Sequence, residues 1–217
     1  MVTSSTRGAI RRRAAARSQP DYRFDFCGGH IAIDFTNTVG NRGLDPEEHF
    51  TPFADIVAWA EARGLVTRSA AAALRQQAAS KPDDASRAHR RAVELREALY
   101  RVLDAAASKR RPRSADLDVL NAHVSATFDG ATLVPSGARF TLDPPRRSGL
   151  DEVLRTVVRA AVDLLTSHEV EHIGRCADDS CAWLFLDATR SRTRRWCDMK
   201  SCGNRNKVRR FRLGTED

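Results

Sequence analysis

The chain of 217 residues is long enough for one medium-sized domain and a small second unit. Its 41% hydrophobic and 29% charged residues are typical of a globular protein in water. No apolar run approaches the roughly 18–20 residues that cross a bilayer, and no apolar segment follows the arginines of residues 1–20, which argues against a secretory signal. We therefore expect a cytoplasmic protein, in which clustered cysteines favour a metal site over disulfides.

The net charge of +8 is concentrated near the two ends of the chain. Residues 1–20 contain five basic and no acidic residues, and residues 187–212 contain ten basic residues against two aspartates. The segment between them, 21–186, has 21 basic and 24 acidic residues and is nearly neutral. This asymmetry favours a polyanionic partner. We predict that residues 1–20 form a disordered basic arm.

The elements of the first 170 residues predict an α+β domain that is mainly helical, with short β-hairpins. Runs of β-forming residues on either side of Gly28-Gly29 predict a hairpin over 24–39. Apolar residues at helical spacing predict helices over 53–63, 68–79 and 85–107, a further helix from 114, and one over 150–165. Pro135-Ser136-Gly137 predicts a second hairpin over 131–143. We expect residues 21–170 to form this domain and its helices to fold without a metal.

Four of the five cysteines fall within 27 residues, as two pairs with the pattern C-x4-C-x15-C-x4-C. These are Cys176, Cys181, Cys197 and Cys202. Two close pairs joined by a loop are how a short chain supplies the four tetrahedral ligands of zinc. Four cysteines leave no position for a water molecule, so we predict one structural Zn²⁺. Cys27 stands alone, and we expect it to be a small buried apolar residue.

The residues around these cysteines predict a small treble-clef-like zinc finger over 171–217. Residues 182–187 and 193–196 resemble the two strands of a hairpin, and residues 204–213 have a high helix propensity. The run Cys202-Gly203-Asn204-Arg205, with the Arg-Arg-Trp-Cys and Leu-Phe-Leu-Asp segments before it, resembles the CGNR zinc finger family. The first part, through Gly28-Gly29, residues 34–38 and residues 95–99, is similar to the ABATE domain that precedes this finger. The resemblance implies a bacterial stress-related transcription regulator with a ligand-sensing domain and a DNA-binding finger.

The basic residues of the finger are candidates for contacts with nucleic acid. Cations on the last helix suit phosphate contacts, with one or two arginines left for guanine edges in the major groove, and arginines of the predicted hairpin are placed to flank the groove. Asn204 either contacts a base or caps the backbone near the metal. The candidates are Arg190, Arg192, Arg194, Arg195, Asn204, Arg205, Lys207, Arg209, Arg210 and Arg212.

Polar residues within apolar segments of the first domain are candidates for a small-molecule pocket. They are Asp34, Asn37, Arg42 and Arg96, and hydrogen bonding within the fold is the alternative explanation for each. We expect no enzyme, because the sequence has no nucleophile–base arrangement, phosphate loop or pair of carboxylates at helical spacing. The sequence thus predicts a zinc-dependent regulator that binds double-stranded DNA. RNA binding and a zinc-stabilised protein-interaction module remain the alternatives.

Overall fold

The computed structural model describes residues 22–143, 145, 149–212 and 214. The predicted disordered arm, residues 1–20, lies outside these described residues. The α-helices are α1 (Ile31–Thr36), α2 (Phe53–Ala62), α3 (Arg68–Ser80), α4 (Pro82–Ala107), α5 (Ser114–Phe128), α6 (Glu152–Thr166) and α7 (Asn204–Arg212). A 3-10 helix, η1 (His168–His172), precedes the first cysteine-rich loop, and a π-helix, η2 (Met199–Gly203), forms part of the second. No helix in the described part of the chain is long and apolar enough to span a membrane.

The strands form three antiparallel pairs of two strands each. They are β1 (Val39–Gly40) with β2 (Glu47–Glu48), β3 (Thr132–Ser136) with β4 (Arg139–Asp143), and β5 (Ile173–Arg175) with β6 (Leu184–Leu186). The predicted hairpin over 131–143 is confirmed as β3–β4, with Leu133 opposite Leu142. The described chain is therefore an α+β protein dominated by helices, as the sequence predicts.

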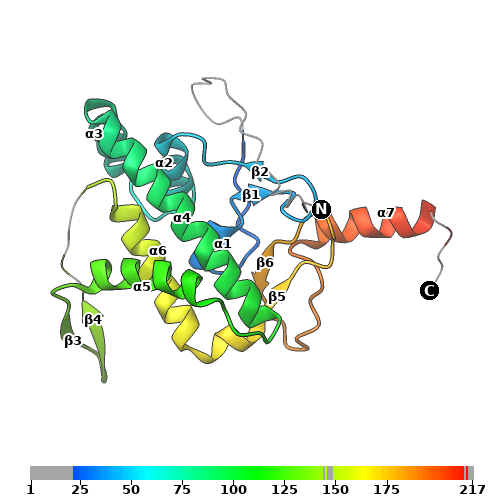
Figure 1. Ribbon diagram of the computed structural model, residues 1–217. Coiled ribbons are helices and arrows are strands. Elements are labelled where there is room, and N and C mark those ends of the chain that lie inside the picture. The colour runs from blue at the N-terminus through cyan, green and yellow to red at the C-terminus, as the bar shows by residue number, and fades with distance from the viewer. Residues whose placement is uncertain (1–21, 144, 146–148, 213, 215–217) are drawn as a thin grey trace, which may run out of the picture.

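The long helix α4 runs through the body and contacts α1, α2, α3 and α5 (Figure 1). The predicted helices over 53–63, 68–79, 85–107 and 150–165 are confirmed as α2, α3, α4 and α6. Each buries the apolar face that its periodicity defines. In α6, for example, Val153, Leu154, Val157, Val158, Ala161 and Leu164 are buried. The largest fully buried side chain in the described residues is Trp59 of α2, whose ring meets those of Phe35 and Phe50 edge-on, with centroids 5.4 and 6.2 Å apart.

The hairpin predicted over 24–39 is wrong. Gly28 and Gly29 lie in a turn that leads into α1, where the ring nitrogen of His30 accepts a hydrogen bond from the amide of Ala32. Residues 32–36 are all buried, because α1 is enclosed by α4, α6 and β6. A short apolar run that is buried on every side shows no periodicity with which to distinguish strand from helix.

The hairpin predicted between residues 182–187 and 193–196 is also wrong. Leu184–Leu186 forms β6, but its partner is β5, which lies before the first cysteine, with Ile173 opposite Leu186 and Arg175 opposite Leu184. Residues 187–194 instead form a loop closed by Asp187, whose carboxylate accepts hydrogen bonds from the amides of Thr189 and Arg194.

Strand β6 joins the zinc finger to the core of the helical body. Leu184 and Leu186 belong to the same buried cluster as the side chains of α1, α2, α4 and α6. The side-chain amide of Asn37 donates to the carbonyl of Leu184 at 2.9 Å and accepts from its N–H at 3.1 Å. The indole of Trp183 donates to the carbonyl of Val39 at 2.7 Å. The two parts therefore share one core, which argues against helices that fold independently of the metal; unfolding measurements test that expectation.

Candidate metal centre and nucleic-acid interface

The sulfur atoms of Cys176, Cys181, Cys197 and Cys202 lie within 4.8 Å of one another, and all four residues are buried. The distance from Cys197 to Cys181 is 3.6 Å, and that from Cys197 to Cys202 is also 3.6 Å. Sulfur atoms at the corners of a tetrahedron around zinc are about 3.8 Å apart, given a Zn–S bond of about 2.3 Å. A disulfide needs about 2.05 Å. The four sulfurs therefore fit a metal, and all described cysteines are free thiols.

The electrostatics of this cluster also favour a cation. Hydrogen bonds from Cys181 and Cys197 hold the pKa of the Cys176 thiol far below its usual value, whereas those with Cys176 and Cys181 raise the pKa of the Cys197 thiol. In a buried cluster, one thiolate can be stabilised by hydrogen bonds from the neighbouring thiols. Four thiolates cannot, because no thiol would be left to donate and their negative charges would repel one another. A divalent ion removes this conflict, and soft thiolates select zinc over hard cations. One zinc held by four thiolates stabilises the fold and has no free position for catalysis.

The first cysteine loop is shaped by Asp178. One carboxylate oxygen of this buried residue accepts hydrogen bonds from the amide and hydroxyl of Ser180. The other oxygen faces α7, where it pairs with Arg205 at 3.1 Å and accepts from Asn206 at 3.0 Å. Asp178 thus fixes both the loop and the last helix. Sequence reasoning missed this residue, although the Asp-x-Ser spacing between the two ligands is typical of an Asx turn.

The residues of the run Cys202-Gly203-Asn204-Arg205 have structural roles in and after the second cysteine loop. A Cβ at Gly203 would lie 2.4 Å from the sulfur of Met199, so glycine lets the Met199 side chain pack against the backbone here, and a larger residue would displace it. Asn204 donates to the carbonyl of Lys200 and so caps the backbone beside the metal site. Arg205 donates to the sulfur of Cys202 at 3.1 Å while it pairs with Asp178. A cation beside a thiolate ligand stabilises its charge.

Comparison with protein-family models supports this assignment of the parts. The ABATE model, described as a putative stress-induced transcription regulator, matches residues 29–168. The chain belongs to the ABATE family. The CGNR zinc finger model matches residues 172–213, which contain all four metal ligands. No curated protein matches the chain. The predicted family and the predicted structural zinc of this ABATE protein are therefore confirmed.

Four of the predicted nucleic-acid contacts are engaged within the finger of the ABATE protein. Arg194 donates to the carbonyls of Cys27, Leu186, Trp196 and Cys197, which ties the loop to the start of the body. Arg192 donates to the carbonyl of Asp187. On α7, Arg205 pairs with Asp178, and Arg209 pairs with Asp179 at 3.6 Å. In sequence these arginines look like the others, because backbone carbonyls and, for Arg205 and Arg209, carboxylates of the first cysteine loop are partners that no local pattern marks.

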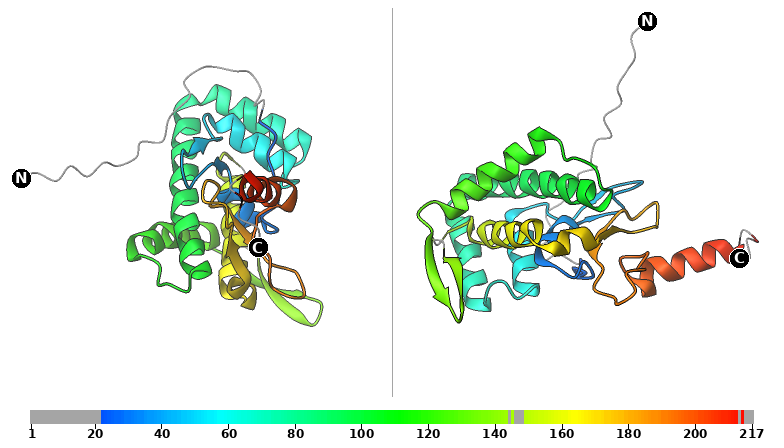
Figure 2. Two further views of the ribbon diagram at one scale, coloured as in Figure 1. Left: turned by 90° about the vertical axis from the view of Figure 1, so that its right-hand side faces the viewer. Right: turned by 90° about the horizontal axis from the view of Figure 1, so that it is seen from below.

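The other candidates lie at the surface of the finger. They are Arg190, Arg195, Asn204, Lys207, Arg210 and Arg212. The guanidinium of Arg195 lies 5.1 Å from the ring of Trp196, in cation–π contact. Helix α7, which carries four of these residues, has no buried residue and projects from the body of the protein (Figures 1 and 2).

Two of the residues proposed for a ligand pocket, Asp34 and Asn37, are bonded within the fold. Asp34 accepts from the amide of Gly28 at 2.9 Å and pairs with Arg63 at 2.8 Å. Its burial raises the pKa of this carboxyl to about 6, despite the neighbouring guanidinium of Arg63. Asn37 bonds the backbone of Leu184 through both ends of its amide.

The other two, Arg42 and Arg96, belong to one ion-pair network around α4. Arg96 is fully buried and forms two hydrogen bonds of 2.6 Å with Glu48, while Glu97 binds both arginines. Burial opposes the charge of Arg96, but Glu48 and Glu97 outweigh it and raise the pKa of the guanidinium. Arg42 also lies over the ring of Tyr100, whose hydroxyl donates to the carbonyl of Ala182. All four residues thus have partners in the protein, and none lines the cavity described below.

Proposed function

We propose that this ABATE protein is a cytoplasmic transcription regulator whose zinc finger binds double-stranded DNA through the outward face of α7. The observation that carries this proposal is that α7, a helix with five cations and no acid, has no buried residue. An α-helix is about 10–12 Å wide with its side chains and fits the major groove, which is about 12 Å wide. A helix so placed meets phosphates on both sides.

The contacts of α7 with the metal site define which face is free. Arg205, Asn206 and Arg209 turn one side of the helix toward Asp178 and Asp179. The positions i, i+3, i+4, i+7 and i+8 counted from the start of the helix lie on another side. They are Asn204, Lys207, Val208, Phe211 and Arg212. We propose Lys207 and Arg212 as phosphate contacts, and Val208 and Phe211 as contacts to thymine methyl groups.

The rigidity of the attachment supports recognition of DNA. Arg205 and Asn206 anchor α7 to Asp178, and the carbonyl of Cys202 accepts a second hydrogen bond from Asn206. Loss of zinc would release both the ligand loop and the start of the helix. We therefore expect binding to require the metal, with Arg205 acting as a positioning residue and not as a base contact.

Fluorescence anisotropy of labelled duplexes, measured against salt concentration, tests this proposal. If four outward cations contact phosphates, a plot of log affinity against log salt concentration should have a slope of roughly −4. These cations are Arg190, Arg195, Lys207 and Arg212. Lys207→Ala and Arg212→Ala should each lower the slope by about one and weaken all duplexes similarly. Arg90→Ala on α4 removes the same charge far from the finger and should leave the slope unchanged. Zinc-loaded protein without affinity for any duplex at low salt would overturn the proposal.

RNA is the second candidate partner, and the exposure of Phe211 favours it. The ring is 86% exposed, and an aromatic side chain beside cations is a common platform for an unpaired base. Competition between duplex DNA and single-stranded RNA separates the two partners. If Phe211→Ala weakens RNA binding more than duplex binding, and RNA displaces the duplex, the RNA function is supported.

A further inference from the structure

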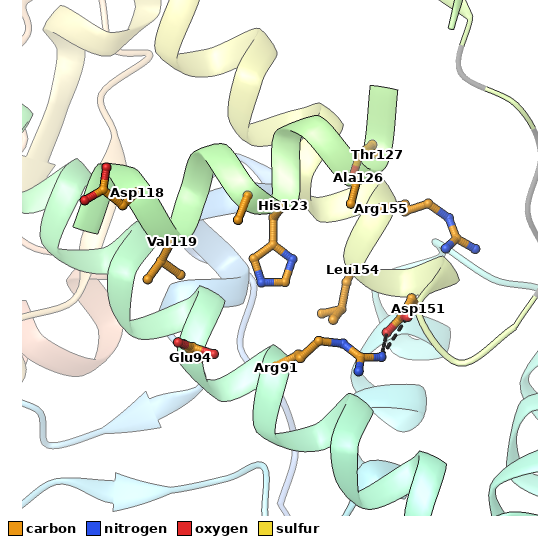
Figure 3. Close-up of a pocket in the computed structure, with 11 residues that line it drawn as sticks. Arg91, Glu94, Asp118, Val119, His123, Ala126, Thr127, Asp151, Leu154 and Arg155 are labelled. Atoms are coloured by element: carbon orange, nitrogen blue, oxygen red, sulfur yellow. Dashed lines mark hydrogen bonds and ion pairs between the residues drawn. The ribbon is translucent and has the colours of Figure 1, made fainter. Parts of the chain in front are cut away.

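A cavity of about 530 Å³ opens between α4, α5 and α6 (Figure 3), and no residue of the zinc finger lines it. This volume lies in the range of small-molecule sites, which is roughly 300–1,000 Å³. The cavity is lined by Arg91, Glu94, Asp118, Val119, Ala122, His123, Ala126, Thr127, Asp151, Leu154 and Arg155.

The cavity exists because α5 faces its neighbours with small side chains. Ala122 and Ala126, one helical turn apart, leave space that larger residues would fill, and only three residues of α5 are buried. Leu154 of α6 and Val119 of α5 supply apolar surface on either side of the imidazole of His123 (Figure 3). Burial lowers the pKa of His123, so its ring is neutral at pH 7 and adds flat, weakly polar surface.

The charged groups of the cavity are segregated. Arg91, Asp151 and Arg155 lie near one end in Figure 3, and Glu94 and Asp118 near the other. Arg91 is neutralised by Asp151, through bonds of 2.6 and 2.7 Å, and Arg155 is engaged as well. In the described part of the chain, no hydrogen bond or ion pair engages Glu94 or Asp118. The lining thus carries three carboxylates against two guanidinium groups, and Glu94 and Asp118 are exposed to solvent beside its apolar walls.

We propose that this cavity binds a small amphipathic organic cation, with its apolar body against Val119, Ala122 and Leu154 and its ammonium group between Glu94 and Asp118. An apolar body gains from leaving water, and an ammonium group gains a charge-assisted hydrogen bond to a carboxylate. Binding here does not depend on the nucleic-acid function proposed for α7, since no lining residue belongs to the finger.

Isothermal titration calorimetry of the full-length, zinc-loaded protein tests the site with two matched probes. Tryptamine carries the cation, and indole-3-propionate carries the same ring on a chain of similar length with the opposite charge. We expect saturable binding of tryptamine at millimolar concentration or below, and at least tenfold weaker binding of indole-3-propionate. Glu94→Gln and Asp118→Asn should each weaken tryptamine binding on the order of tenfold, the loss typical of a hydrogen bond to a charged group.

Two further variants separate this cavity from general attraction of cations to the surface. Asp45→Asn removes an exposed carboxylate from the loop between β1 and β2 and should leave tryptamine binding unchanged. Ala126→Phe fills the cavity from the exposed side of α5 and should abolish binding, while circular dichroism shows that the helices are retained. Preference for indole-3-propionate, equal effects of Asp45→Asn and Glu94→Gln, or failure of both probes to bind would each overturn the proposal.

Discussion

Replacing Leu184 by alanine tests whether the zinc finger and the helical body share one core. Leu184 lies on β6, is fully buried, and packs with side chains of the helical body. A buried Leu→Ala substitution costs about 2–5 kcal/mol, and more where the surroundings cannot collapse into the cavity. Here Asn37 holds the backbone of Leu184 by two hydrogen bonds, so the strand cannot move to fill the space. We therefore expect a loss of about 3–5 kcal/mol in the free energy of unfolding.

The assay is thermal and urea unfolding followed by far-UV circular dichroism, which reports mainly on the helices α2 to α6. A loss of 3–5 kcal/mol corresponds to a fall in Tm of roughly 6–20 °C for a chain of this size. Leu117→Ala makes the same substitution at a position of α5 that is 36% exposed, and should cost less than about 1 kcal/mol. If the two variants unfold alike, or if Leu184→Ala adds a separate finger transition and leaves the helical transition unchanged, the shared core is refuted.

Removal of zinc by a chelator should also destabilise the helical body. Without the metal, only hydrogen bonds such as those of Asp178 and Arg194 hold the two cysteine loops, and we expect β6 to lose its order together with Leu184 and Leu186. Burying a leucine side chain is worth about 1.5–3 kcal/mol, so the helical body should lose about 3–6 kcal/mol. Since domains are stable by only about 5–15 kcal/mol, chelation should bring the whole protein close to unfolding.

Three other outcomes follow from the structure. Cys197→Ser should abolish stoichiometric zinc binding, measured by elemental analysis of protein purified without chelators, because the tetrahedron loses one thiolate. The pKa of Asp34 is raised to about 6, so the folded protein binds a proton more readily than the unfolded chain. Its stability relative to Asp34→Asn should therefore rise as the pH falls from 7 to 5, as urea unfolding at each pH will show. Arg96→Met leaves Glu48 and Glu97 without their buried partner. The free energy of unfolding, measured in urea, should fall by about 3–5 kcal/mol, while tryptamine binding persists at low temperature.

The metal ligands and the amphipathic helices were predictable because their signals are local. Two C-x4-C pairs define a tetrahedral site by spacing alone. In α6, apolar residues spaced three and four apart indicate which face of the helix is buried. The same holds for β3–β4, whose strands are joined by the turn at Gly137 and Ala138, beside the predicted Pro135-Ser136-Gly137 signal.

The elements that sequence reasoning missed depend on partners far along the chain. Strand β6 pairs with β5 across the first cysteine loop and bonds Asn37 from 147 residues away, and no local pattern records either contact. Arg194 and Arg205 resemble DNA-binding arginines in sequence, but their carbonyl, carboxylate and sulfur partners turn them inward. Likewise, the cavity arises from the gap that α5 leaves against α4 and α6, so its lining residues share no sequence motif.

The hydrogen bonds that join β6 to Asn37, the residue after α1, bear on how this protein evolves and how it can be engineered. Zinc fingers that fold alone can be exchanged between proteins as cassettes. A graft of residues 172–213 would carry Leu184 and Leu186 into water and would leave behind the amide of Asn37 and the carbonyl of Val39 that receives Trp183. The finger and the helical body must therefore be inherited and redesigned together, and recombination that separates them should yield two insoluble halves.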